Sequence, residues 1–316
     1  MRCLRILALS LVASWSLSGG HAQRPSPAGP RPAITGIAFM RVYTTDPAAA
    51  EHFYGVTLGL KRLEQGDTWI YPVNDRQWVE VLPHTPPPSA SSRMAAVAFM
   101  TRDAAALERY LNARGIPTTE PMHDGEFGVR DPEGNLVLFV NAGGSDGRGR
   151  GGIPKLVATA KPSATAPSQR IIHVGFIVRD RAKEDAFWRA ALGFTPYWHG
   201  GRTETETSWV SQQVPDGTDW LEYMLGIPET PTLKETGVQD HFSLGVERIQ
   251  TVLAQLQANG CSDAPCRAIQ VGRDGKIQLN LYDPDQTRVE FMEFAPVIKG
   301  CCSPIVGRHP GSVESK

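Results

Sequence analysis

The chain has 316 residues, of which 41% are hydrophobic and 21% are charged, and its formal net charge is −1. This length is enough for two domains, and the composition excludes an intrinsically disordered chain. Because there is no basic block, nucleic acid and anionic membrane surfaces are not expected as partners.

The first predicted element is a targeting segment. Arg2 and Arg5 stand before an apolar run over residues 6–17, and Gly20-His21-Ala22 offers small residues for a cleavage site. This pattern is typical of a secretory signal peptide over residues 1–22, and it is too short to span a membrane. We therefore expect an exported protein, periplasmic or secreted, without a membrane anchor.

Two halves of the chain repeat each other, residues 34–142 and residues 170–298, and a Gly-, Pro- and Ser-rich linker is predicted over residues 143–169. Phe53-Tyr-Gly-Val-Thr-Leu-Gly59 in the first half matches Phe187-Trp-Arg-Ala-Ala-Leu-Gly193 in the second. Each half divides again at a Pro- and Ser-rich joint into two units of strand, helix and further strands. Four such units are predicted, and self-similarity of this kind is stronger evidence than any single segment.

Three polar residues of the second half interrupt short apolar runs that are typical of strands. They are His173 in Arg-Ile-Ile-His-Val-Gly-Phe, His241 in Asp-His-Phe-Ser-Leu, and Glu290 in Arg-Val-Glu-Phe. Side chains alternate across a strand, so Ile172 and Val174 are predicted to pack on a helix while His173 points to the opposite face. The same alternation places His241 and Glu290 on that face. Two histidines and a carboxylate can hold a divalent transition metal and leave positions open for a substrate.

Each of these residues has a structural alternative to its functional role. A lone strand histidine is usually a buried residue satisfied by hydrogen bonds, but two at equivalent places with Glu290 on a third strand favour a metal site. Glu222 is predicted to face the same side as a ligand or general base. Glu80 occupies the same place in the first half, so a structural role for Glu222 stays open. Glu293 is expected on the other face, solvated or structural.

Four cysteines follow the predicted signal peptide, Cys261, Cys266, Cys301 and Cys302. Export permits disulfides, and four cysteines allow three pairings. Cys261 and Cys266 bracket a short loop that permits a local bridge, but the pairing stays open. No cysteine has the histidine neighbourhood that a cysteine nucleophile needs, so no catalytic cysteine is expected.

With these motifs the sequence resembles the vicinal oxygen chelate superfamily, which includes glyoxalase I, extradiol dioxygenases and bleomycin- or fosfomycin-resistance proteins. The resemblance covers about residues 34–298. It implies an α+β fold in which four βαβββ modules form two glyoxalase-like domains with curled mixed sheets. It also implies that His173, His241 and Glu290 hold a metal on a concave face, with Glu222 at a fourth ligand position.

The resemblance further implies that only one half binds metal. In the first half the positions matching the three ligands are taken as Gly36, Ala96 and Leu138, and only Glu80 is kept. A single carboxylate cannot replace the set. We therefore expect one divalent ion per chain, in the second half, and Fe²⁺, Mn²⁺, Ni²⁺ and Zn²⁺ all stay open.

The implied function is that of a metal-dependent lyase or isomerase, in which the ion acts as a Lewis acid on a small substrate with vicinal oxygens and Glu222 moves a proton. A non-haem Fe(II) extradiol-type dioxygenase is one alternative, although Asp274 and Asn280 stand where that class is expected to carry an acid/base His and a Tyr. A resistance-type protein that binds a small molecule without catalysis is the other. A small-molecule substrate is the expected partner, and a homodimer is left open.

Overall fold

The computed structural model describes residues 29–142 and 152–312. The predicted signal peptide over residues 1–22 lies outside this range, and so do residues 143–151 at the start of the predicted linker. Within the two described ranges, no helix combines the length and the apolar character that crossing a membrane requires.

The first half is built from two rounds of a strand, a helix and three further strands. Its strands are β1 (Ile34–Tyr43), β2 (Leu63–Gln65), β3 (Thr68–Pro72), β4 (Trp78–Leu82), β5 (Met94–Thr101), β6 (Glu120–His123), β7 (Glu126–Arg130) and β8 (Leu136–Asn141). Its helices are α1 (Pro47–Glu51), which continues as the π-helical turn η1 (His52–Thr57), and α2 (Ala104–Asn112). A further helix, α3 (Gly152–Thr159), stands between the halves.

The second half repeats this order with one added helix. Its strands are β9 (Ile171–Ile177), β10 (Thr195–Gly200), β11 (Trp209–Gln213), β12 (Trp220–Met224), β13 (His241–Val246), β14 (Ile269–Val271), β15 (Ile277–Tyr282) and β16 (Arg288–Glu293). Its helices are α4 (Arg181–Asp185) with the π-helical turn η2 (Ala186–Ala191), α5 (Leu233–Gln239), α6 (Ile249–Ala258) and the 3₁₀ turn η3 (Ala264–Arg267).

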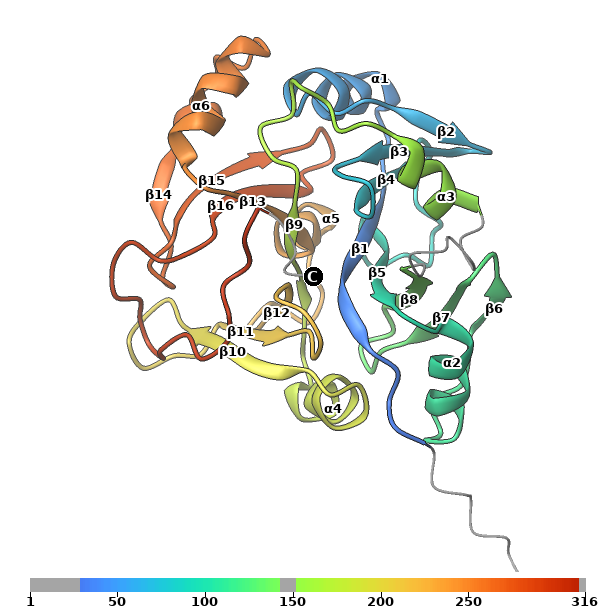
Figure 1. Cartoon of the computed structure of the whole chain (residues 1–316). Coiled ribbons are helices and arrows are strands. Elements are labelled where there is room, and N and C mark those ends of the chain that lie inside the picture. The colour runs from blue at the N-terminus through green and yellow to red at the C-terminus, as the bar shows by residue number, and fades with distance from the viewer. Residues whose placement is uncertain (1–28, 143–151, 313–316) are drawn as a thin grey trace, which may run out of the picture.

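Each half forms one eight-stranded mixed sheet. The strand order is β2-β3-β4-β1-β5-β8-β7-β6 in the first sheet and β10-β11-β12-β9-β13-β16-β15-β14 in the second. In each sheet the two modules meet at an antiparallel central pair, β1 with β5 and β9 with β13. Figure 1 shows the two sheets side by side, with β1 and β9 adjacent at the centre. The predicted α+β fold of four βαβββ modules in two glyoxalase-like domains is confirmed.

The two halves share one apolar core. Buried aromatic side chains from both sheets meet in it, and the ring of Phe99 in β5 lies 5.3 Å from that of Trp188 in η2 and 5.4 Å from that of Phe194. Such rings contribute large buried areas, so the core resists separation of the halves. The second half is therefore held in place by the first.

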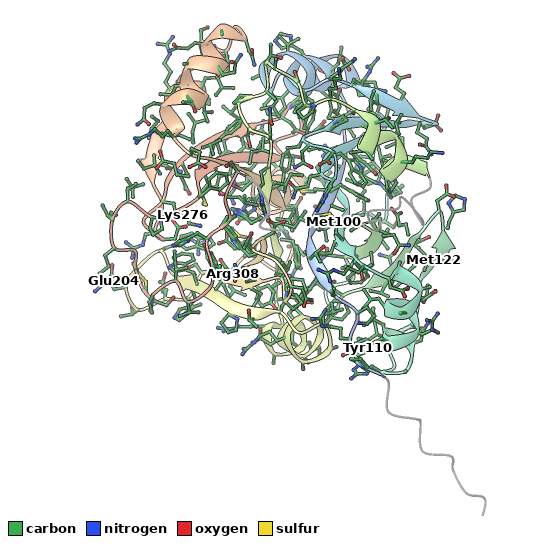
Figure 2. All side chains as sticks on the ribbon, in the orientation of Figure 1. Met100, Tyr110, Met122, Glu204, Lys276 and Arg308 are labelled. Carbon is green, nitrogen blue, oxygen red and sulfur yellow. A yellow bond between two sulfur atoms is a disulfide. The ribbon has the colours of Figure 1, made fainter. Side chains whose placement is uncertain are left out.

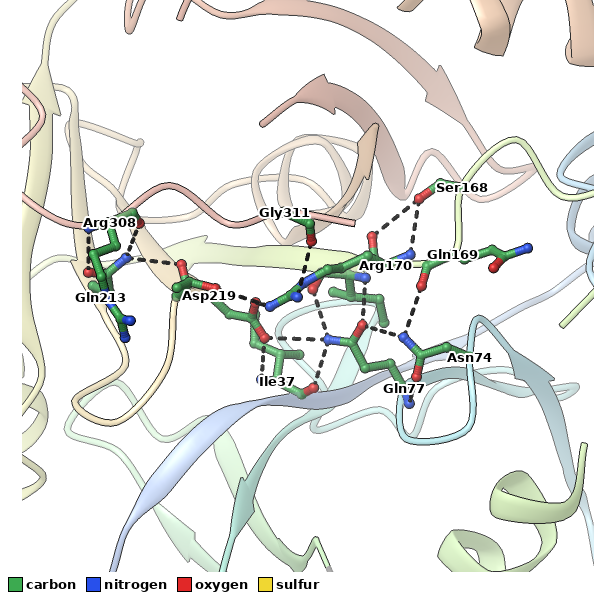
Figure 3. Close-up of polar contacts among 12 residues, drawn as sticks. Ile37, Asn74, Gln77, Ser168, Gln169, Arg170, Gln213, Asp219, Arg308 and Gly311 are labelled. Atoms are coloured by element: carbon green, nitrogen blue, oxygen red, sulfur yellow. Dashed lines mark hydrogen bonds and ion pairs between the residues drawn. The ribbon is translucent and has the colours of Figure 1, made fainter. Parts of the chain in front are cut away.

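A buried polar network also joins β1 and β9, as Figure 3 shows. The amide of Gln77 donates to the carbonyl oxygens of Ile37 (3.0 Å) and Ile171 (2.8 Å) and accepts from the backbone N–H of Ile171 (2.9 Å). Asp219 accepts from Arg170 at 2.7 Å and from the N–H of Ile37 at 3.0 Å. These bonds satisfy polar groups that would otherwise cost free energy when buried. They fix β9, which carries His173, against the first half.

Glu293 and Ile172 show where the alternation of side chains along a strand holds and where it fails. Glu293 is buried and accepts a hydrogen bond from the backbone N–H of Ile249 at the start of α6 (2.9 Å), which is a structural role. The prediction that Ile172 packs on a helix is wrong. The pairing of β9 with β13 shifts between His173 and Ile171, and Ile172 joins the cluster on the concave face with Trp220. Such a bulge interrupts the alternation on which the prediction relied.

The stability of the fold is expected to depend on pH through two buried acids where the halves meet. Burial and the nearby Asp131 raise the pKa of Glu184 in α4, and burial raises the pKa of Asp131. The pKa of such an acid in the unfolded chain is near 4. An acid with a raised pKa in the folded state contributes its full stabilisation below the unfolded pKa. This stabilisation is lost as the pH rises from there through the folded pKa. Between about pH 5 and pH 8 the free energy of unfolding should therefore fall less in Glu184→Gln than in the wild type, by on the order of 1–3 kcal/mol.

Thermal unfolding at a series of pH values checks this. Gln cannot accept both hydrogen bonds that Glu184 accepts, from Trp188 and from the N–H of Glu133, so the absolute stability will fall as well. The slope against pH is therefore the informative quantity. An unchanged slope in the variant would contradict the assignment.

Candidate metal centre

Three neighbouring strands bring the predicted ligands together. Ser243 in β13 pairs with His173 in β9 on one side and with Glu290 in β16 on the other, while His241 pairs with Gly175. The Nε2 atom of His173 lies 3.0 Å from Nε2 of His241 and 3.2 Å from a carboxylate oxygen of Glu290. All three side chains are buried, and their candidate ligand atoms lie within 4.8 Å of one another.

The donor set fits a divalent cation. Nδ1 of His241 lies 2.7 Å from the carbonyl oxygen of Gln239, and this contact assigns the proton to Nδ1 and leaves Nε2 unprotonated, as a metal ligand must be. Burial lowers the pKa of His173 and of His241 well below the usual value, and the charge of Arg288 lowers both further. Two neutral imidazole nitrogens with a carboxylate beside them match the 2-His-1-carboxylate set of transition-metal sites.

Gly175 makes room for this arrangement. A Cβ atom at this position would lie 2.1 Å from Cε1 and 2.6 Å from Nδ1 of His241, which is closer than atoms can approach. Any larger residue would displace the imidazole ring. Glycine at this position therefore allows His241 to reach its neighbours across the central strand pair.

Glu222 lies beside the three ligands rather than among them. Its carboxylate is 3.9 Å from Nε2 of His241, and it accepts a hydrogen bond of 3.3 Å from the hydroxyl of Ser211. Burial, and then the charge of Glu290, raise the pKa of Glu222 to about 8. A carboxyl group with such a pKa can carry a proton at neutral pH.

A cavity of about 300 Å³ opens onto Glu222 and Glu290. Aromatic side chains and charged groups share its walls, and its lining includes Tyr197, Trp198, Trp209, Trp220, Arg273, Asp274, Arg288 and Met292. Trp209 and Met292 line the cavity, whereas Tyr223 is part of the core. The size and lining suit a small molecule.

Sequence reasoning missed two cations near the centre. Nη2 of Arg288 donates to Nε2 of His241 at 2.8 Å. Lys276 is fully buried, with Nζ 4.1 Å from the ring of Trp220 and 3.2 Å from the hydroxyl of Tyr197, and burial lowers its pKa to about 8. Arg288 precedes Glu290 by two residues on one strand, so alternation alone would have placed it on the same face.

The register of the first sheet corrects one prediction. Glu80 pairs with Arg41, and the equivalent Glu222 pairs with Gly175, so Arg41 is the counterpart of Gly175. Two residues earlier on the same strands, Phe39 is the counterpart of His173. The assignment of Gly36 as that counterpart is therefore wrong. The ring geometry agrees, because Phe39 lies 4.8 Å from Trp78 and His173 lies 4.9 Å from Trp220. Ala96 and Leu138 correspond to His241 and Glu290, as predicted.

In the first half an ion pair occupies the place that corresponds to the candidate metal centre. Arg41 forms a salt bridge with the fully buried Glu80, which also accepts a hydrogen bond of 2.8 Å from Trp78. Phe39, Ala96 and Leu138 pack around it, and Val157 of α3 completes this apolar cluster. The helix inside the predicted linker was not foreseen, and its apolar side chains pack on this cluster of the first sheet.

The Arg41–Glu80 pair is expected to be structural. Arg41→Met leaves the carboxylate of Glu80 buried without its partner, and loss of one member of a buried pair costs about 3 kcal/mol or more. Urea unfolding should show this loss while the metal content of the folded protein is unchanged. The double variant Arg41→Met/Glu80→Gln, which keeps an acceptor for Trp78, should recover part of the stability. A single variant as stable as the wild type would refute the assignment.

Comparison with known proteins identifies the family. Sequence models of the Glyoxalase/Bleomycin resistance protein/Dioxygenase superfamily match residues 36–139 and residues 172–278. The chain therefore belongs to this superfamily, which is the vicinal oxygen chelate superfamily that its motifs resemble. No curated protein matches the chain.

Several solved structures share this fold over most of the length of the chain. A variant of homoprotocatechuate 2,3-dioxygenase from Brevibacterium fuscum is 21% identical with a TM-score of 0.60, over 85% of this chain and 74% of that one. Homoprotocatechuate 2,3-dioxygenase from Arthrobacter globiformis is 20% identical with a TM-score of 0.57, over 85% of this chain and 83% of that one. At this identity the likeness shows the fold alone.

Proposed function

We propose that this chain is a metal-dependent enzyme of the lyase or isomerase type, acting on a small substrate with two neighbouring oxygens. The observation that carries the proposal is the meeting of His173, His241 and Glu290 beside a cavity that Glu290 and Glu222 line. His173, His241 and Glu290 would hold a divalent ion, which would supply Lewis-acid polarisation of the substrate oxygens. Glu222 then serves as the group that moves a proton.

The residues around the cavity support this division of roles. Glu222 lies 3.9 Å from His241, so a substrate oxygen beside the centre is within reach of its carboxyl group. Ser211 holds Glu222 in place through its hydroxyl. The walls made by Trp198, Trp209 and Trp220 favour the apolar part of a small molecule. Arg288 supplies a positive charge for negative charge that develops on the substrate.

A non-haem Fe(II) dioxygenase is the second candidate, and two observations favour it. Among the residues that the structure describes, three candidate ligands converge here, and a set of three would leave coordination positions for oxygen as well as substrate. The similar solved structures include an extradiol ring-cleaving dioxygenase from B. fuscum. Against this candidate, Asp274 at the cavity wall and Asn280 beside Glu290 are poor replacements for an acid/base His and Tyr.

An oxygen electrode separates the two candidates. The protein is loaded with Fe²⁺, Mn²⁺, Ni²⁺ or Zn²⁺ and supplied with panels of catechols, α-hydroxy ketones and hemithioacetals. The lyase or isomerase proposal expects product without oxygen, including under anaerobic conditions and with a metal that does not change oxidation state. Stoichiometric oxygen consumption with a diol, restricted to the Fe²⁺ form, would overturn it in favour of the dioxygenase.

Export is a further part of the proposal. The motivation is the charged start, the apolar run and the small residues ending at Ala22. N-terminal sequencing of the protein recovered from the periplasm or medium should begin at Gln23. Mature protein that still begins at Met1 would contradict export through a cleaved signal.

A further inference from the structure

Two adjacent cysteines border the mouth of the cavity without belonging to the metal centre. The carbonyl oxygen of Cys301 accepts a hydrogen bond of 2.8 Å from Nε1 of Trp198. The Sγ atom of Cys301 lies 2.9 Å from Nη2 of Arg273. Trp198 and Arg273 both line the cavity. The Cys301–Cys302 segment is therefore attached to the cavity wall from two different parts of the second half.

The two sulfurs are joined in a disulfide, and a second disulfide joins Cys261 and Cys266. The sequence had left these pairings open. Cys302 is exposed and Cys301 is half-buried, so solvent and small reagents reach the bond. In contrast, Cys266 is 3% exposed and packs against the core. The pair at the cavity mouth is thus the more accessible of the two.

A carboxylate completes a possible ligand set around these sulfurs. Glu204, in the loop between β10 and β11, offers a carboxylate oxygen that lies within 4.8 Å of the Sγ atoms of Cys301 and Cys302. Arg273 holds Glu204 in this place, with Nη2 and Oε1 2.9 Å apart. Figure 2 shows Glu204 at the outer edge of the second half, where an ion can reach it from solvent.

The charges around these atoms favour a divalent ion once the disulfide is reduced. Two thiolates and one carboxylate carry three negative charges, and the guanidinium of Arg273 offsets one of them. A divalent cation then makes the cluster neutral. Arg273 beside Cys301 also favours the thiolate form, which is the form that binds metal. Thiolates are soft ligands and select ions such as Zn²⁺ and Cd²⁺.

We propose that reduction of the Cys301–Cys302 disulfide creates a second metal site, in which both thiolates and Glu204 bind a thiophilic divalent ion at the cavity mouth. With a phosphine as reductant, the phosphorus and one water reduce the S–S bond to two thiols and yield a phosphine oxide. The ion then replaces the two thiol protons. Because the sulfurs bond either to each other or to the ion, the disulfide and the metal-bound form exclude one another.

Titration of the full chain with Cd²⁺ tests the proposal. The protein is reduced with a phosphine, the free thiols are counted with a thiol reagent, and the thiolate-to-cadmium charge-transfer absorbance is followed in the ultraviolet. Reduced wild type should gain one equivalent of Cd²⁺ with this absorbance, and the oxidised protein should show none of it. Imidazole and carboxylate ligands give no such band, so binding at His173, His241 and Glu290 does not interfere.

Three variants locate the signal. Cys261→Ser/Cys266→Ser should keep the band, Cys301→Ser/Cys302→Ser should lose it, and Glu204→Gln should keep it with Cd²⁺ affinity weakened about tenfold or more. Circular dichroism confirms that each variant is folded. The proposal is overturned if fully reduced wild type shows no band, if the band survives in Cys301→Ser/Cys302→Ser, or if it disappears with Cys261→Ser/Cys266→Ser. It does not depend on the proposed function.

Discussion

Replacing His173 or His241 with alanine is expected to remove the bound metal, from one equivalent per chain to almost none. Each substitution deletes one of three ligands in a buried centre where no other described histidine lies close enough to replace it. Changes to groups that only support a ligand already weaken metal binding about 10–100-fold, so loss of a ligand should exceed that range. Elemental analysis after dialysis of the oxidised protein measures the effect.

His199→Ala is the matched control. His199 lies in β10 of the same half, but its side chain is exposed and belongs to no ligand cluster. This variant should keep one equivalent of metal. If His173→Ala and His241→Ala both retained a full equivalent, the metal would have to bind elsewhere.

Glu222→Gln is expected to lower turnover about 10²–10⁴-fold while the metal remains bound. The amide keeps the shape of the side chain and its contact with Ser211, but it cannot take up or release a proton. The three ligands His173, His241 and Glu290 are unchanged, so elemental analysis should still find one equivalent. Steady-state kinetics, with the metal content measured in the same samples, gives the result.

Glu80→Gln provides a control at the equivalent position of the first half. Glu80 is fully buried and paired with Arg41, so this variant should lose stability but not turnover per folded molecule. Full activity of Glu222→Gln would show that Glu222 has the same purely structural role. The dioxygenase candidate would then be the stronger one.

The candidate metal centre was accessible from sequence because its three residues interrupt apolar runs. Alternation is a local property, so it placed His173, His241 and Glu290 on one face without knowledge of the strand pairing. The distances between them depend on how β9, β13 and β16 pair, and only the structure shows this. Glu222 was placed on the correct face for the same reason.

The first half was harder to interpret because β1 is buried on both faces. Ile37, Ala38, Phe39 and Met40 are all fully buried, so no alternation marks the concave face. The error at Gly36 arose from this. The sequence repeat does identify the correct counterpart of His173, because Phe39 lies 14 residues before Phe53 and His173 lies 14 residues before the matching Phe187.

Other features depend on contacts that no local pattern records. Helix α3 is short, and Val157 gains its burial only from the first sheet. The segment after β16 runs back along β10, where the backbone of Val306 bonds to Tyr197 and Nδ1 of His309 lies 3.0 Å from the same tyrosine hydroxyl. His309 carried no pattern in the sequence, since its partner is more than 100 residues away.

Anomalous diffraction from crystals of the oxidised, metal-loaded protein tests the central claim most directly. The claim predicts a single strong peak in the second half, within about 2.0–2.2 Å of Nε2 of His173, Nε2 of His241 and a carboxylate oxygen of Glu290 if the ion is zinc. It predicts no peak beside Arg41 and Glu80. Absence of the peak between His173 and His241 in crystals whose metal content is confirmed, or a peak in the first half, would contradict the claim.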